Sequence, residues 1–343
     1  MGALRFATMV LGPDEVIIAD DYHTAGEPFR IVDLGPMEGD SVLDRRSWAM
    51  YNLDDHRRFL CNEPRGHADM YGGMVVPPDD PDGDVGVVFF HKDGFSTACG
   101  HGTIAMATWA IDTGRISAPE DGQVTVIVDV PSGRLPTVAH MVNGRVASVR
   151  FTNVEAFVSA RELMVDTSLG PVTAHVSFGG AFYASVAVDD LPVSCRPDDV
   201  NHLITLGREV KAVLGDHPSV IHPSDDRLSG LYGTILHEGV QSPPEGACLH
   251  QRNVTIFADG QVDRSPCGSG TCARLALLHD DGRLDVGDPF HHEGVAGGTF
   301  EARIEAVTDM GIIPSVKGSS HRHATTTFTL DPHDPVGLGF LFR

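Results

Sequence analysis

The chain has 343 residues, with 25 Lys or Arg against 47 Asp or Glu, so its formal net charge is −22. So acidic a protein would be repelled by nucleic acid and by anionic lipid, which excludes nucleic-acid and membrane-surface partners. Hydrophobic residues make up 41% and charged residues 21%, enough to bury a full core, and the length suggests about two domains.

The N-terminal residues predict a cytoplasmic protein. Residues 1–18 lack the basic start and the long apolar core of a signal peptide. The longest apolar stretches fall well short of the ~20 residues that span a bilayer. Six cysteines in a chain of this length fit a reducing compartment, so their neighbourhoods matter more than their number.

Strands and helices are predicted along the whole chain. Alternating or β-branched runs bounded by turns predict strands at 15–18, 85–90, 124–130, 145–151, 182–188 and 253–257. Asn143-Gly144 and Asp259-Gly260 are typical hairpin turns between such runs. Apolar spacing predicts helices over 103–111, 200–215 and 271–279. The first and the last of these helices each follow a loop rich in cysteine and glycine.

These two loops form an internal repeat. Residues 98–105 read Ala-Cys-Gly-His-Gly-Thr-Ile-Ala, and residues 266–273 read Pro-Cys-Gly-Ser-Gly-Thr-Cys-Ala. The cysteine, both glycines, the threonine and the last alanine coincide at one offset of about half the chain. A fainter echo joins 25–29 to 179–182. Two homologous halves are therefore predicted, one carrying Cys99 and the other Cys267.

Each Cys-Gly-X-Gly-Thr loop is expected to bind an anion and to activate its cysteine. Unpaired backbone N–H groups and the positive end of a helix dipole attract a carboxylate, and they lower the pKa of a nearby thiol. If the halves pack about a pseudo-twofold axis, Cys99 and Cys267 face each other. One sulfur can then remove a proton from an α-carbon while the other returns one, without metal or cofactor. His101 and Asp263 are the natural partners for a substrate amine.

Five ordered blocks resemble the signature motifs of the proline racemase family, which includes 4-hydroxyproline 2-epimerases and trans-3-hydroxyproline dehydratases. The blocks are 21–32, 63–70, 99–103, 177–180 and 263–271. The resemblance implies an α/β (α+β) fold of two pseudo-symmetric halves, each a curved mixed sheet around a central helix, as in diaminopimelate epimerase. It also implies a homodimer, no cofactor and a two-base reaction on a small-molecule substrate, proline or hydroxyproline.

The resemblance assigns the acid/base pair to Cys99 and Cys267. It assigns the substrate amine to His101 and Asp263, and a further, loosely aligned contact to His237. Backbone amides that would hold the carboxylate are those of Gly100, His101, Gly268 and Ser269. We expect residues 1–165, joined by 325–343, to form the half that carries Cys99, and residues 166–324 to form the half that carries Cys267.

The departures from the family pattern bear on the substrate. Dehydratases of the family usually carry threonine at the position of Cys267, which favours epimerisation here. Ala181 stands where many members have asparagine, and Gly102 resembles the hydroxyproline group. We therefore expect 2-epimerisation of trans-4-hydroxy-L-proline to cis-4-hydroxy-D-proline, with proline racemisation or a 3-hydroxyproline epimerase or dehydratase reaction as the alternatives.

Two other classes of protein remain open from the residues alone. A cysteine hydrolase would use Cys99 as nucleophile and His101 as base, although this leaves the second loop unexplained. A non-enzymatic amino-acid-binding protein would also suit two anion-binding helix ends. No paired spacing typical of zinc is present, so no metal is expected. The remaining cysteines are predicted to pack as small apolar residues: Cys61, Cys195, Cys248 and Cys272.

Overall fold

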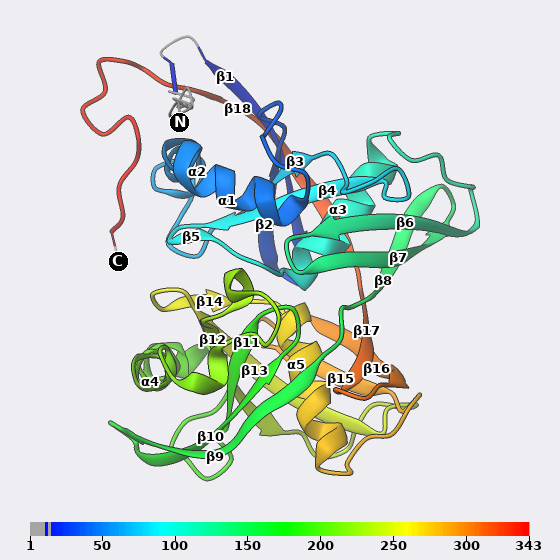
Figure 1. Ribbon diagram of the computed structural model, residues 1–343, viewed down its shortest axis with the longest axis vertical. Coiled ribbons are helices and arrows are strands. Elements are labelled where there is room, and N and C mark those ends of the chain that lie inside the picture. Colours follow the sequence, from blue (N-terminus) through cyan, green and yellow to red (C-terminus); the bar gives the residue numbers. More distant parts are fainter. Residues whose placement is uncertain (1–10, 13–14, 343) are drawn as a thin grey trace.

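The computed structural model describes residues 11–12 and 15–342, which form a mixed α/β fold (Figure 1). The helices are α1 Val42–Asn52, α2 Asp54–Cys61, α3 Gly100–Asp112, α4 Val200–Leu214 and α5 Gly268–Asp280. Short 3₁₀ turns occupy Pro197–Asp199, Pro218–Val220 and Asp226–Leu228. The strands are β1 Val16–Thr24, β2 Glu27–Val32, β3 Tyr71–Val76, β4 Val85–His91, β5 Gly94–Phe95, β6 Gly122–Val130, β7 Gly133–Val142, β8 Arg145–Thr152, β9 Phe157–Thr167, β10 Gly170–Phe178, β11 Phe182–Ala187, β12 Leu231–Gly239, β13 Leu249–Phe257, β14 Gln261–Asp263, β15 Phe290–Gly294, β16 Thr299–Val307, β17 Ile312–Gly318 and β18 Ser320–Thr329.

These strands belong to one large mixed sheet. Hairpins are antiparallel, whereas β2 with β3, β4 with β6, β11 with β12 and β13 with β15 run parallel. The antiparallel pairing of β8 with β17 connects the upper and lower parts of the molecule in Figure 1. The mixed α/β class is therefore confirmed.

The strands and helices predicted from periodicity are confirmed. The predicted strands correspond to β1, β4, β6, β8, β11 and β13, and the predicted helices to α3, α4 and α5. The turn at Asn143-Gly144 joins β7 to β8, and both of its residues have positive φ, as a two-residue hairpin requires. The turn at Asp259-Gly260 joins β13 to β14. The fainter echo of the repeat consists of two further hairpin turns, at Gly26 (φ +91°) and Gly180 (φ +98°).

Helices α3 and α5 are the buried centres of the fold. Helix α3 contacts β1, β2, β6, β7, β8 and β18, whereas α5 contacts β9, β10, β11, β16 and β17. Both helices are buried around nearly their whole circumference, as expected for helices enclosed by other elements. The strands therefore enclose both helices, which also contact each other.

The two ends of the described chain share the upper part of the molecule. Strand β18 pairs along its length with β1 (Figure 1). Strand β9 pairs with β10 in the lower part. The expected limits at residues 165 and 325 each lie inside one of these strands, so we propose dividing the chain before β9 and before β18.

No helix in the described part of the chain is long and apolar enough to cross a membrane.

Candidate active site

The N-terminal ends of α3 and α5 touch at their first glycines. A Cβ built on Gly100 would lie 2.5 Å from Cα of Gly268, and a Cβ built on Gly268 would lie 2.5 Å from Cα of Gly100. No other residue type fits at this contact without displacing backbone. The glycine after each cysteine is therefore required by the meeting of the two helices, which brings the two loops of the repeat together.

Cys99 is the N-cap residue of α3. Its Sγ accepts the backbone N–H of Gly102 at 3.3 Å and lies 3.5 Å from both ring nitrogens of His101. A Cβ on Gly102 would lie 2.8 Å from this sulfur, so the second glycine of the loop leaves room for the thiol. The thiol is 5% exposed.

Cys267 precedes α5 with a different backbone conformation. Its φ is +62°, in the left-handed region that a residue with a Cβ seldom adopts, and its sulfur does not cap the helix. The sulfur lies 3.6 Å from the hydroxyl of Tyr183. A strained backbone at a buried reactive group is typical of a functional site.

The expected lowering of the thiol pKa values is wrong for this structure. Burial raises the pKa of Cys99 well above its usual value and also raises that of Cys267, with Asp263 adding to both increases. The N–H of Gly102 and the hydroxyl of Tyr183 act in the opposite direction, each on its own thiol. Desolvation outweighs the helix dipole here because both sulfurs are almost completely enclosed.

His101 and Asp263 come together from opposite parts of the molecule. Nδ1 of His101 lies 4.0 Å from Oδ2 of Asp263, and both side chains are buried. Burial lowers the pKa of His101 to about 3, so its imidazole is neutral at pH 7. Burial also raises the pKa of Asp263 to about 6. A neutral imidazole beside a carboxylate can accept N–H donors from an ammonium group.

Glu27 is a further buried acid at the site. Its Oε2 accepts the backbone N–H of Arg264 at 2.7 Å, and its Oε1 is buried without a partner. Burial and the neighbouring Asp263 hold the pKa of Glu27 well above its usual value. Glu27 lies in the first signature block, 21–32, but no catalytic or binding role was assigned to it from the sequence.

Three tyrosines that the motifs did not single out surround the cysteines. The hydroxyl of Tyr183 lies 2.7 Å from Oγ of Ser269, and the ring of Tyr71 packs edge-on against His101 with centroids 5.0 Å apart. The hydroxyls of Tyr71 and Tyr232 are 3.0 Å apart, and Tyr71 also bonds Ser96. These residues provide phenolic donors around a small buried site.

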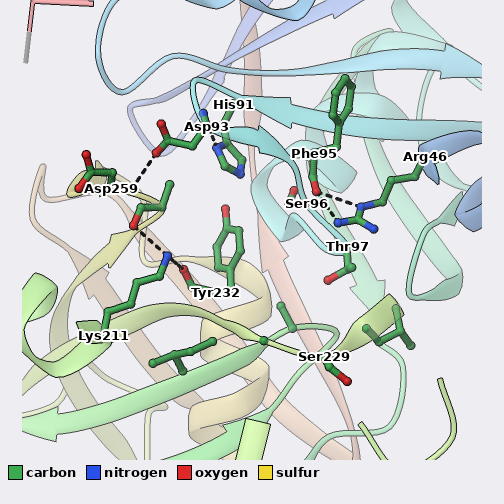
Figure 2. A pocket seen from close by; sticks show the side chains of 15 residues that line it. Arg46, His91, Asp93, Phe95, Ser96, Thr97, Lys211, Ser229, Tyr232 and Asp259 are labelled. Carbon is green, nitrogen blue, oxygen red and sulfur yellow. Dashed lines mark hydrogen bonds between the residues drawn. The ribbon is translucent and has the colours of Figure 1, made fainter. Parts of the chain in front are cut away.

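A cavity of about 370 Å³ opens next to Tyr232 (Figure 2). Ser96 and Tyr232 line it, and Lys211 donates to the backbone carbonyls of Tyr232 and Ala258 at its wall. Arg46 donates to the carbonyl of Phe95 on the opposite wall. Tyr232 therefore connects the wall of this outer cavity to His101 through Tyr71, whose hydroxyl contacts that of Tyr232 and whose ring packs on His101.

The structure brings together the cysteines, both glycine amides, Ser269, His101 and Asp263, but not His237. His237 lies on β12 and lines a separate cavity beside Arg274, whose lining includes neither thiol. Cys61, Cys195 and Cys272 are buried as predicted, whereas the prediction for Cys248 is wrong, because that side chain is exposed. Within the residues that the structure describes, no group of His, Cys, Asp and Glu is arranged to hold a metal.

Fold and site together define an α/β protein with two buried thiols at the N-terminal ends of two central helices. The chain belongs to the proline racemase family, whose model matches residues 19–341. The trans-3-hydroxy-L-proline dehydratase of Burkholderia cenocepacia is 41% identical over 334 residues, covering 94% of this chain and 97% of the relative. The 3-hydroxyproline 2-epimerase of Burkholderia multivorans is 40% identical with the same coverage.

Solved structures agree with this family. A hydroxyproline epimerase from Agrobacterium vitis with bound trans-4-hydroxy-L-proline has a TM-score of 0.87 at 28% identity, covering 96% of both chains. A Bacillus anthracis phenazine biosynthesis protein of the PhzF family has a TM-score of 0.59 at 11% identity, covering 92% of this chain and all of that one. The second comparison shows a shared fold alone.

Proposed function

We propose that this protein is a cofactor-independent two-base epimerase that inverts C2 of a hydroxyproline. The observation that carries the proposal is the contact of Gly100 with Gly268, which opposes the helix ends that bear Cys99 and Cys267. The names of relatives at 40–41% identity favour trans-3-hydroxy-L-proline as substrate, ahead of the trans-4-hydroxy-L-proline that the motifs favour. The bound ligand of the Agrobacterium vitis enzyme keeps the 4-hydroxy isomer as the next candidate.

The reaction follows from the chemistry of the grouped side chains. The substrate carboxylate would accept backbone N–H groups at both helix ends, which also stabilise the charge that develops as C2 loses its proton. The ammonium group would donate to Asp263 and to neutral His101. One cysteine, as thiolate, takes the proton from C2, and the thiol of the other gives a proton to the opposite face. The two cysteines then exchange roles for the reverse direction.

Dehydration is the second candidate, favoured by the names of several relatives. It shares the first step, loss of the C2 proton to a thiolate. The hydroxyl then leaves C3 as water after taking a proton from an acid, and the resulting enamine tautomerises to a cyclic imine. Cys267 argues for epimerisation, because a second thiol can return a proton to C2.

The deciding experiment is NMR of separate reactions in deuterium oxide with trans-3-hydroxy-L-proline, trans-4-hydroxy-L-proline and L-proline. We expect trans-3-hydroxy-L-proline to give cis-3-hydroxy-D-proline carrying deuterium at C2. A cyclic imine product would assign the dehydratase reaction instead. Faster turnover of trans-4-hydroxy-L-proline would restore the substrate that the motifs favour.

Absence of C2 exchange with all three compounds would overturn the proposal. The Cys99→Ala variant is the control for contaminating activity, because it keeps the fold but loses one acid/base group. We also propose that the two halves are related by a pseudo-twofold axis and that the protein is a homodimer. Light scattering on a sizing column measures the oligomeric state directly.

A further inference from the structure

A second cavity, of about 380 Å³, lies between β10, β12 and the later turns of α5. Its lining contains neither cysteine of the proposed reaction. The ionisable or potentially charged side chains that line it are His175, Asp190, His237, Arg274, Asp281 and Arg283. The cavity is therefore polar and separate from the proposed catalytic site.

Arg274 is a buried cation without a carboxylate partner. It is 4% exposed, and its Nε donates to Oε1 of Gln251 at 3.0 Å. No salt bridge of Arg274 exists within the described residues, and its remaining guanidinium N–H groups have no acceptor there. Burial lowers the pKa of this guanidinium to about 10, which leaves it charged at pH 7.

The other buried arginines of the described chain are all paired. Nε of Arg30 lies 2.8 Å from Oδ1 of Asp21. Arg57 and Arg45 also have carboxylate partners, at 2.7 Å and 3.9 Å: Asp54 and Asp79 respectively. A buried charge is ordinarily paired because desolvation is costly. Arg274 differs from these three buried arginines because it has no carboxylate partner among the described residues, and it lines a cavity.

His237 adds an imidazole to the lining of the same cavity. Its side chain is 6% exposed, and its Nδ1 is buried without a hydrogen-bond partner. Burial and the nearby Arg274 hold its pKa well below the usual value, so the imidazole is neutral and can donate one N–H.

The carboxylates of the cavity limit which anion fits. Asp281 shares the guanidinium of Arg161 with Asp280, and Asp190 and Arg283 line the cavity as well. The lining thus holds two carboxylates and two guanidinium groups, and Asp281 and Asp189 lie near enough to act on the charge of Arg274, although neither forms a salt bridge with it within the described residues. A singly charged anion matches this balance better than a doubly charged phosphate does, and the planar guanidinium fits a carboxylate through two parallel hydrogen bonds.

We propose that Arg274 and His237 form a binding site for a small monocarboxylate, distinct from the site between the cysteines. Arg274 binds the carboxylate through its free N–H groups, and His237 donates one more hydrogen bond. The site does not depend on the proposed epimerase reaction.

The test is the thermal unfolding midpoint of the full-length protein in 0–100 mM sodium acetate, with sodium chloride holding ionic strength constant. We expect acetate to raise the midpoint of the wild type by about 1–3 °C. Arg274→Met should lose most of this rise, and Arg274→Lys, which keeps the charge without the planar fork, should lose part of it. Arg208→Met, which removes an arginine whose side chain is 58% exposed, is the matched control and should keep the full rise.

An equal acetate-dependent rise in the wild type and in both Arg274 variants would overturn the proposal, since acetate would then bind elsewhere. A rise with phosphate as large as that with acetate would overturn the assignment to a monocarboxylate. If Arg274→Met does not fold, Arg274→Lys decides alone. Competitive inhibition by acetate reports the catalytic site separately, and we expect the same inhibition constant in wild type and Arg274→Lys.

Discussion

The two cysteine loops share a sequence pattern but differ in how each holds its sulfur. Cys99 has an extended backbone, with φ −158°, and caps its own helix by accepting the N–H of Gly102. Cys267 has φ +62°, and its sulfur lies beside the hydroxyl of Tyr183 instead. The first thiolate would thus be stabilised by its own helix, and the second chiefly by Tyr183 from another strand, with smaller contributions from the N–H of Gly270 and from Thr255.

The glycines and threonines of the two loops behave alike. The N–H of each threonine donates to the carbonyl of its cysteine, at 2.9 Å for Thr103 and 2.7 Å for Thr271. The comparison therefore shows which structural features the two copies of the motif share. Local backbone bonds and close contacts are preserved, whereas the environment of each sulfur depends on what the rest of the chain packs around it.

The largest effect is expected from removing either sulfur. Cys99→Ala and Cys267→Ala should each lower turnover in both directions by at least ~10²–10⁴-fold, because each direction needs one base and one acid. Chiral chromatography of product from each epimer measures this. Near-normal turnover by Cys267→Ala, or product that retains its original hydrogen in deuterium oxide, would show that the loops are not equivalent partners.

The contact between the loops can be broken at its first glycines. Gly100→Ala or Gly268→Ala should lower kcat/KM by on the order of 10², because the new Cβ must push the opposite helix end away and misplace the reacting groups. Gly239→Ala is the matched control, since a Cβ there meets only ordinary contact at 3.5 Å. Equal activity of the three variants would contradict a site built on the meeting of the two helices.

His101 is neutral at pH 7, whereas Asp263 is an anion above its raised pKa. The Asp263→Asn variant tests the role of that negative charge. We expect kcat/KM to fall about 10-fold or more, because a charged partner of the substrate amine is lost. Burial raises the pKa of Asp263 from 3.8 to about 6, so the folded protein binds more protons than the unfolded chain between these values. Ionisation of Asp263 therefore destabilises the folded protein: the effect is absent below pH 4, grows as pH rises to 6 and is complete above pH 6.

The same substitution should thus stabilise the protein at neutral pH. Asp263→Asn is expected to raise the free energy of unfolding by about 2–3 kcal/mol at pH 7 and to leave it unchanged at pH 3. Denaturant unfolding at the two pH values measures the difference. A variant less stable than wild type at pH 7 would mean that the ionised Asp263 is well solvated or well paired.

The smallest effect is expected at the hydroxyl that distinguishes the second loop. Tyr183→Phe should lower kcat/KM by about 2- to 10-fold, the cost of one neutral hydrogen bond. It should also move the rise of kcat/KM with pH upward, because the phenol lowers the pKa of Cys267. Tyr22→Phe is the control, since that hydroxyl bonds Asp112 at the opposite end of α3. An unchanged pH profile in Tyr183→Phe would show that the Tyr183 hydroxyl does not lower the pKa of Cys267.

Elements with a local signal were predictable, although not all were recognised. Helix α1 begins with a capping box, in which Ser41 and Asp44 bond each other's backbone N–H, yet no helix was predicted there. Helices α3 and α5 begin three residues earlier than their apolar spacing indicates, because Gly100 and Gly268 form the first turn of each. Glycine has a low helix propensity, so the sequence did not predict this first turn, although the contact between the two helices requires glycine there.

The sequence alone determined the family, the two cysteine loops and the helices that follow them, because each depends on neighbouring residues and their order. The tertiary structure decided which distant side chains complete the site: Tyr183 reaches Ser269 across 86 positions, and Arg264 reaches Glu27 across 237. It also decided the protonation of the thiols and the lack of a partner for Arg274, since desolvation depends on everything packed around a group rather than on its neighbours in the chain.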